Sequence, residues 1–216
     1  MGRAPSLCGV ILAAGESTRM GADKALLPWP PVAPGSAATG QTFLSAAIEA
    51  LSSFNDMVIV VAGKNEANLS PVVYANGGFI VQNPAPERGQ FSSLQVGLQE
   101  VLNRGRDAAT VTLVDRPPVA TATLAQLHAA FEMALARGQW AVVPEYGGKH
   151  GHPILVSREM IEEFLKAPPA ATAREIEHRN QVHIEYVPVT DPFVAMNVDT
   201  PQDYVALSTL ASAQPK

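Results

Sequence analysis

The chain is expected to form an α/β protein with a mostly parallel central sheet, and three features of the sequence predict this. Short, nearly continuous apolar runs alternate with longer stretches in which apolar residues recur every three or four positions. Such runs are typical of strands covered on both faces, and such spacing is typical of helices that bury one side. Regular alternation of the two favours parallel pairing with helices on both faces of the sheet.

Apolar runs place the expected strands at residues 7–13, 57–62, 78–81, 110–114, 140–144 and 154–156. The helical spacing places helices at residues 42–54, 92–103 and 121–137, and a last helix is expected to open at Thr200-Pro201. Ligands of parallel α/β sheets gather at the carboxyl ends of the strands. The loops after Ala13 and Val114 are therefore the expected functional edge.

A length of 216 residues with 47% hydrophobic content fits a single domain, residues 1–216. Two segments interrupt the pattern of strands and helices. Residues 28–40 are rich in proline and glycine and are expected to form a surface excursion. The tail after residue 210 is expected to fray.

Charge and composition exclude several classes of partner. The net charge of −5 offers no basic excess to neutralise nucleic acid. No apolar span approaches the roughly 18 residues that cross a membrane. Cys8 is the single cysteine, so an intrachain disulfide is impossible, and we expect a small buried thiol in a cytoplasmic protein.

The loop after the first expected strand combines small residues with two cations. Its sequence is Leu12-Ala13-Ala14-Gly15-Glu16-Ser17-Thr18-Arg19-Met20-Gly21-Ala22-Asp23-Lys24. Small residues let backbone N–H groups approach an anion, while Arg19 and Lys24 supply positive charge. This predicts a phosphate-binding loop, although a glycine turn with two solvated cations remains an alternative. The P-loop and dinucleotide-binding motifs are both absent.

Two carboxylates follow expected strands. Asp115 follows the apolar run at residues 110–114. Asp199 lies in the segment from Met196 to Asp203, which ends another expected strand, with Thr200-Pro201 opening the last helix. Magnesium is held in proteins by one or two carboxylates together with substrate phosphates. The two residues would suit Mg²⁺ if the fold brings them together, and otherwise they are turn or capping residues. Asp203 is expected to stabilise the first turn of the last helix.

The motif Leu12-Ala13-Ala14-Gly15-x-Ser17-x-Arg19-Met20-Gly21-x-x-Lys24 resembles the signature of Rossmann-like nucleotidyltransferases. Within that group the chain is most similar to the molybdenum cofactor cytidylyltransferases and their guanylyl relatives. The resemblance runs from Leu7 to about Leu207. It implies a three-layer α/β/α fold with a mostly parallel sheet. It also implies a Mg²⁺-dependent transfer of CMP from CTP to molybdopterin, with release of pyrophosphate, and a molybdoenzyme as the partner that receives the product. The guanylyl branch usually carries Ala-Gly-Gly at positions 13–15, so Ala13-Ala14-Gly15 favours CTP.

The resemblance also implies roles for individual residues. Catalysis is assigned to Arg19, Lys24 and Asp115, and metal binding to Asp115 and Asp199. The nucleotide would contact Leu12, Ala13, Ala14, Gly15, Arg19, Lys24, Gln90 and Ser93. The acceptor would contact Arg116, Gly151 and His152, although a loop histidine held by backbone hydrogen bonds is the alternative for His152. Arg116 departs from the family, which usually has glutamine there.

Three other functions compete with this one. An enzyme of the same fold could use GTP, or could act on a sugar or polyol phosphate. A non-catalytic nucleotide-binding subunit could keep the fold, but it would have less need of Arg19, Lys24, Asp115 and Asp199 together. A nicotinamide-dependent reductase is disfavoured because the dinucleotide fingerprint is missing.

Overall fold

A single mixed sheet forms the centre of the molecule in a computed structural model, which describes residues 5–15, 17, 20–31 and 40–211. In the described part of the chain the sheet has eight strands in the order β3-β2-β1-β4-β7-β5-β6, and β8 pairs with β5. The strands are β1 Leu7–Ala13, β2 Met57–Ala62, β3 Phe79–Gln82, β4 Ala108–Leu113, β5 Ala141–Tyr146, β6 Lys149–His150, β7 Ile154–Ser157 and β8 Ile184–Pro188. Because the strands come from both ends of the chain, we infer one domain.

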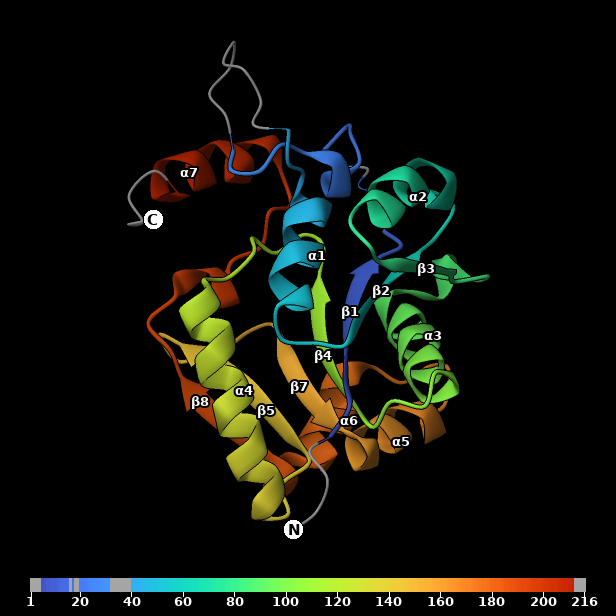
Figure 1. Cartoon of the computed structure of the whole chain (residues 1–216), viewed down its shortest axis with the longest axis vertical. Helices are drawn as coiled ribbons and strands as arrows, with labels where there is room; N and C mark the ends of the chain where they lie inside the picture. Colours follow the sequence, from blue (N-terminus) through green and yellow to red (C-terminus); the bar gives the residue numbers. More distant parts are fainter. Residues whose placement is uncertain (1–4, 16, 18–19, 32–39, 212–216) are drawn as a thin grey trace.

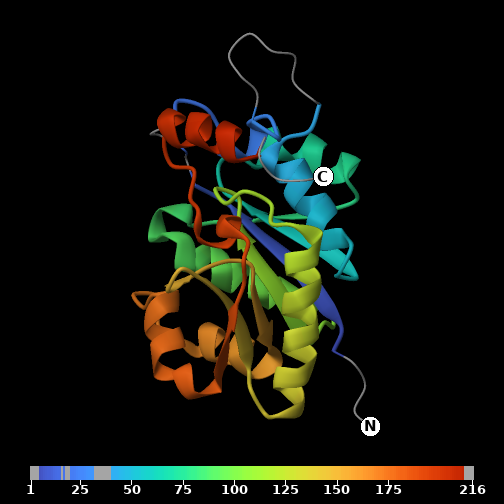
Figure 2. The same ribbon diagram turned by 90° about the vertical axis from the view of Figure 1, so that its left-hand side faces the viewer.

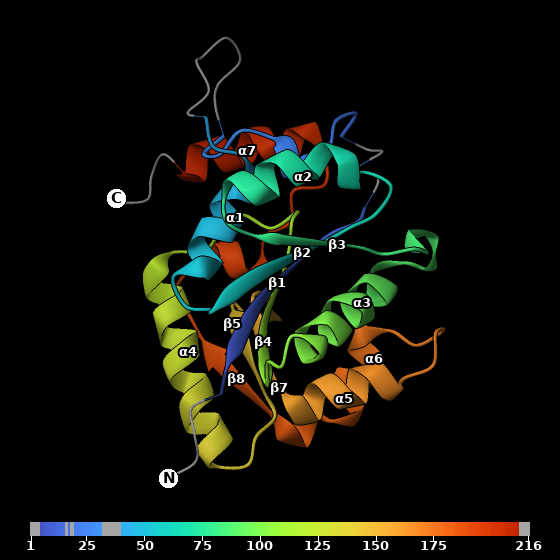
Figure 3. The ribbon, with the colours of Figure 1, turned by 45° about the vertical axis from the view of Figure 1, so that its right-hand side comes forward.

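Helices cover both faces of the sheet, as Figure 3 shows. One face carries α1 (Phe43–Ser52), α2 (Glu66–Ala75) and α4 (Thr121–Ala136). The other carries α3 (Gln90–Asn103), α5 (Arg158–Lys166) and α6 (Ala173–Arg179). The last helix, α7 (Pro201–Ala211), lies across the end of the molecule toward which β1 points (Figures 1 and 2). The predicted α/β architecture is confirmed.

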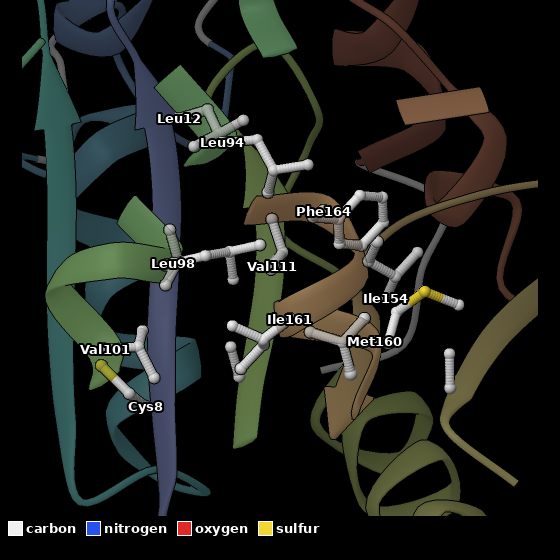
Figure 4. Close-up of a cluster of buried hydrophobic side chains, with 14 of the residues drawn as sticks. Cys8, Leu12, Leu94, Leu98, Val101, Val111, Ile154, Met160, Ile161 and Phe164 are labelled. Atoms are coloured by element: carbon white, nitrogen blue, oxygen red, sulfur yellow. The ribbon is translucent and has the colours of Figure 1, made fainter. Parts of the chain in front are cut away.

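Alternate residues of β1 enter different cores. Cys8, Val10 and Leu12 pack with α3 and α5 in the cluster of Figure 4, while Ile11 and Ala13 pack against α1. Both sets are buried, which explains the continuous apolar run. Burial also raises the pKa of the Cys8 thiol to about 12, so this thiol is the inert buried group that was expected.

Several elements differ from the expected boundaries. Strand β7 is antiparallel to both β4 and β5, so the sheet is mixed on that side. Helix α2 was not expected, because it buries only Leu69 and Val73 and has a weak apolar pattern. Helix α3 begins at Gln90, two residues before the expected start, with Gly89 as its N-cap. Residues 32–39 of the 28–40 excursion and residues 212–216 of the tail lie outside the described ranges.

None of the helices in the described ranges combines the length and apolar character that crossing a bilayer requires.

His128 predicts a pH dependence of stability. Its ring lies on α4, stacks on Phe54 with 5.0 Å between ring centroids, and has Nε2 3.4 Å from Oγ1 of Thr110. Burial lowers the pKa of His128 from 6.5 to about 4. Between these values the unfolded chain binds more protons than the folded one, so stability falls as the pH falls from 6.5 to 4.

His128→Gln should therefore lose less stability than the parent protein over that interval, measured as the shift of the urea midpoint. The exposed His178 on α6 offers a matched control, since His178→Gln should keep the parent's pH dependence. An unchanged pH dependence in His128→Gln would contradict the burial argument.

Candidate active site

A cleft of about 300 Å³ opens at the carboxyl ends of β1 and β4. Its lining residues come from five separate stretches of sequence: Leu12, Ala14, Gly15, Ser17, Lys24, Pro86, Gly89, Gln90, Ser93, Leu113, Val114, Asp115 and Asp199. Eight residues assigned from the sequence are in this set. Ala13 is not, because its side chain is buried against α1. Arg19 lies outside the described residues.

The loop after β1 forms the floor of the cleft. A Cβ built on Gly15 would meet nothing within 4 Å, so the backbone there faces open space. On the opposite side of the loop, Gly63 follows β2, and a Cβ at that position would lie 2.7 Å from the carbonyl oxygen of Ala14. Only glycine at position 63 permits this approach. The loop therefore presents its backbone to the cleft, as the phosphate-loop prediction requires.

Lys24 reaches across the cleft to both carboxylates. It is the first residue of the short 3₁₀ helix η1 (Lys24–Leu26), whose N-cap is Asp23. Its Nζ lies 2.7 Å from Oδ1 of Asp199 and 3.9 Å from Oδ2 of Asp115. Because Lys24 is only 8% exposed, its charge needs these partners.

Asp115 and Asp199 are brought together by the backbone. The N–H of Val198, the residue before Asp199, donates to the carbonyl of Asp115 at 2.8 Å and so joins residues 83 positions apart. Asp203 accepts from the backbone N–H groups of Asp199 and Thr200, so it stabilises the start of α7 as expected. These bonds hold the segment that carries Asp199 against the end of β4.

The environment of Asp115 fits a cation ligand. Burial raises the pKa of its carboxyl, Asp199 raises it further, and Lys24 and Arg116 oppose that shift. Its Oδ1 is buried and has no hydrogen-bond partner among the described residues. Such an oxygen can accept a metal ion. The described residues offer no cluster of three or more His, Cys, Asp or Glu side chains, so two carboxylates are the available set. That set suits Mg²⁺, which takes few protein ligands, better than zinc.

Gln90 and Ser93 line the opposite wall from the first turn of α3. Asn83 is buried and its Nδ2 donates to Oγ of both Ser92 and Ser93, at 2.9 and 3.0 Å. Its Oδ1 accepts from the N–H of Ala85. Asn83 therefore fixes the wall against the end of β3.

The residues assigned to the acceptor lie outside the cleft lining and meet at Val194, in the 3₁₀ helix η4 (Pro192–Ala195). The Val194 carbonyl accepts from Nη1 of Arg116 and from the backbone N–H of His152, each at 2.9 Å. A Cβ on Gly151 would overlap this carbonyl. Burial, and then Arg116, lower the pKa of His152 to about 3, so its ring is neutral. These contacts are structural, and the acceptor role stays a prediction.

Sequence reasoning missed Asp23 and Asn65, which support the loop from behind. Asn65 Nδ2 donates to the carbonyl of Ala13 at 3.0 Å and to Oδ2 of Asp23 at 2.7 Å. No signal in the sequence pointed to this role, because α2 was not expected and an asparagine at a helix start usually marks only a cap.

Comparison with known proteins agrees with this geometry. The family described as MobA-like NTP transferase domain matches residues 9–184 of the chain. The molybdenum cofactor cytidylyltransferase of Escherichia coli (strain K12) is 26% identical over 198 residues, 91% of this chain and 92% of that protein. A probable molybdenum cofactor guanylyltransferase of Rhodopirellula baltica is 32% identical over 57% of this chain and 54% of its own length.

Among solved structures, Rv0371c of Mycobacterium tuberculosis H37Rv has a TM-score of 0.76 and 27% identity, covering 96% of this chain and 100% of that one. The same protein in complex with manganese has a TM-score of 0.71 and 25% identity, covering 94% of this chain and 98% of that one. The resemblance inferred from the loop after β1 is confirmed. The chain belongs to the family of MobA-like NTP transferase domains and is a nucleotidyltransferase.

Proposed function

We propose that this nucleotidyltransferase transfers CMP from CTP to the phosphate of a molybdopterin-type acceptor, with Mg²⁺ and with release of pyrophosphate. The observation that carries the proposal is the meeting of Lys24, Asp115 and Asp199 beside the Ala14–Gly15 backbone in one cleft. A phosphate loop, a buried cation and a carboxylate pair are the groups that a triphosphate and its metal ion require.

The reaction needs no nucleophilic side chain. An oxygen of the acceptor phosphate attacks the α-phosphorus, and the bond from that phosphorus to the bridging oxygen breaks, so pyrophosphate leaves. Transfer of this kind depends on positioning and charge stabilisation. The backbone at Gly15 orients the triphosphate, and Lys24 offsets negative charge on the α-phosphate and on the leaving pyrophosphate. Arg19 is assigned the same kind of role from the sequence.

Asp115 and Asp199 would hold the metal ion, and Oδ1 of Asp115, which has no hydrogen-bond partner among the residues that the structure describes, supports this assignment. A bound Mg²⁺ supplies charge neutralisation at phosphate oxygens. The manganese complex of Rv0371c, a 25% identical protein, also favours a divalent cation.

Three observations favour cytidine. The relative named as a cytidylyltransferase matches 91% of this chain, whereas the guanylyltransferase matches 57%. The loop reads Ala13-Ala14-Gly15 rather than Ala-Gly-Gly. Gln90 lines the cleft and offers both an amide donor and a carbonyl acceptor to the edge of a pyrimidine. The higher identity of the guanylyltransferase over its shorter match, 32%, keeps GTP as the second candidate.

Pyrophosphate release should be at least about tenfold faster with CTP than with GTP, ATP or UTP, given Mg²⁺ and molybdopterin-type cofactor. The measurement is kcat/KM for each triphosphate. Preference for GTP would overturn the base assignment. Release that requires a sugar or polyol phosphate instead would overturn the acceptor.

Asp115→Ala should abolish pyrophosphate release, because it removes a carboxylate from the proposed metal site. Asp107→Ala is the matched control, since Asp107 precedes the same strand β4 at its other end and its side chain forms an exposed ion pair with Arg158. Normal magnesium-dependent turnover by Asp115→Ala would show that the metal assignment is wrong.

Lys24→Ala should slow turnover by about two orders of magnitude or more, the loss expected for one preorganised electrostatic contact. Lys166→Ala provides the control, because that ammonium is on the surface of α5 with 67% of its side chain exposed. Rates within about twofold of the parent enzyme would exclude Lys24 from the chemistry.

A further inference from the structure

Asn65 departs from the role that its position predicts. It occupies the N-cap of α2, where an asparagine side chain normally accepts from an N–H of its own helix. Here its side chain makes no capping hydrogen bond. The polar groups of this side chain instead form hydrogen bonds elsewhere in the fold, and departures of this kind from local rules concentrate at functional sites.

Both the nitrogen and the oxygen of the Asn65 side-chain amide form hydrogen bonds with the loops around the cleft. Its Nδ2 donates to the carbonyl of Ala13, the last residue of β1, at 3.0 Å and to Oδ2 of Asp23 at 2.7 Å. Its Oδ1 accepts from the N–H of Gly63 at 3.0 Å. One side chain therefore joins the ends of β1 and β2 to the turn before Lys24.

Asp23 connects Asn65 to the short helix that carries Lys24. Its Oδ1 accepts from the N–H of Ala25 at 3.1 Å, and Asp23 is the N-cap of η1, whose first residue is Lys24. The carboxylate of Asp23 thus has one oxygen on Asn65 and the other on the backbone that carries Lys24. A shift of Asp23 would move the origin of the Lys24 side chain.

The close packing of the loop makes such a shift consequential. Gly63 approaches the carbonyl of Ala14 so nearly that a Cβ would not fit, and Lys24 is buried with its Nζ 2.7 Å from Asp199. A displacement of about 1 Å at a positioning group can slow a reaction by roughly a hundredfold.

We propose that Asn65 is a positioning residue for nucleotidyl transfer: through Asp23 it fixes η1 so that Lys24 faces the cleft. The proposal rests on the role of Lys24 in the proposed function. Asn65 itself does not line the cleft and would touch no reacting atom.

A double-mutant cycle on pyrophosphate release tests the proposal. Asn65→Ala should lower kcat by about tenfold to a hundredfold, with a smaller change in KM for the triphosphate. In the Lys24→Ala background, the same substitution should change kcat by less than about twofold, because the group that it positions is gone. Asn76→Ala serves as the control, since Asn76 is an exposed asparagine at the other end of the same helix α2.

The outcomes separate the two proposals. If Lys24→Ala slows turnover but Asn65→Ala costs the same factor in both backgrounds, Asn65 acts by another route and only the present inference is overturned. If Lys24→Ala leaves the rate unchanged, the role of Lys24 fails and this inference fails with it.

A reciprocal exchange covers the case in which Asn65→Ala does not fold. Asn65→Asp places two carboxylates together and should slow turnover more than tenfold. Asp23→Asn combined with Asn65→Asp restores a donor facing an acceptor between these two side chains, but not the bond to the Ala13 carbonyl, so the recovery should be partial. The double variant should recover at least about tenfold in kcat, and that recovery should vanish in the Lys24→Ala background. No recovery, or equal recovery without Lys24, would overturn the proposal.

Discussion

The buried ammonium of Lys24 is the group on which the arrangement of the cleft depends. It is 8% exposed and lies 2.7 Å from a carboxylate oxygen of Asp199 and 3.9 Å from one of Asp115. An ammonium removed from water is stable only beside compensating charge, so these partners must stay in place. Lys24 follows β1, Asp115 follows β4 and Asp199 precedes α7. One set of charges thereby holds together three segments that are distant in sequence.

The same charges set the chemistry of the site. Burial favours the neutral form of Asp115 and nearby Asp199 adds to this, while the cations Lys24 and Arg116 favour the carboxylate. A divalent cation at the two carboxylates would compete with Lys24 for their negative charge. This local balance lets a protein of net charge −5 accommodate a highly anionic ligand.

Close backbone packing gives the cleft its width. The glycine at position 97 lets α3 pack on the sheet, since a Cβ there would lie 2.8 Å from Val10 and 2.9 Å from Val61. Helix α3 carries Gln90 and Ser93, so its distance from β1 and β2 sets where that wall stands. Gly63 likewise lets the backbone after β2 approach Ala14, which belongs to the loop that forms the floor of the cleft. The positions of the polar groups thus follow from how nearly the helices and loops approach the sheet.

The sequence by itself determined the α/β class, the limits of β1 and β2, and most of the cleft, because apolar runs and the loop motif from Leu12 to Lys24 are local patterns. It also predicted Asp115 from the apolar run before it and Asp199 from the family resemblance, although the strand expected before Asp199 is wrong, because residues 196–199 form a loop between η4 and α7. Only the tertiary structure decided that Lys24 bridges these carboxylates. It also decided that the Arg116 side chain and the His152 backbone N–H donate to the Val194 carbonyl, and that the Asn65 side chain bonds to the loop after β1 instead of capping its own helix. Each of these contacts joins segments that are far apart along the chain. Partners of this kind are selected by burial and by the need to satisfy polar groups in the folded molecule, and local sequence patterns do not encode that selection.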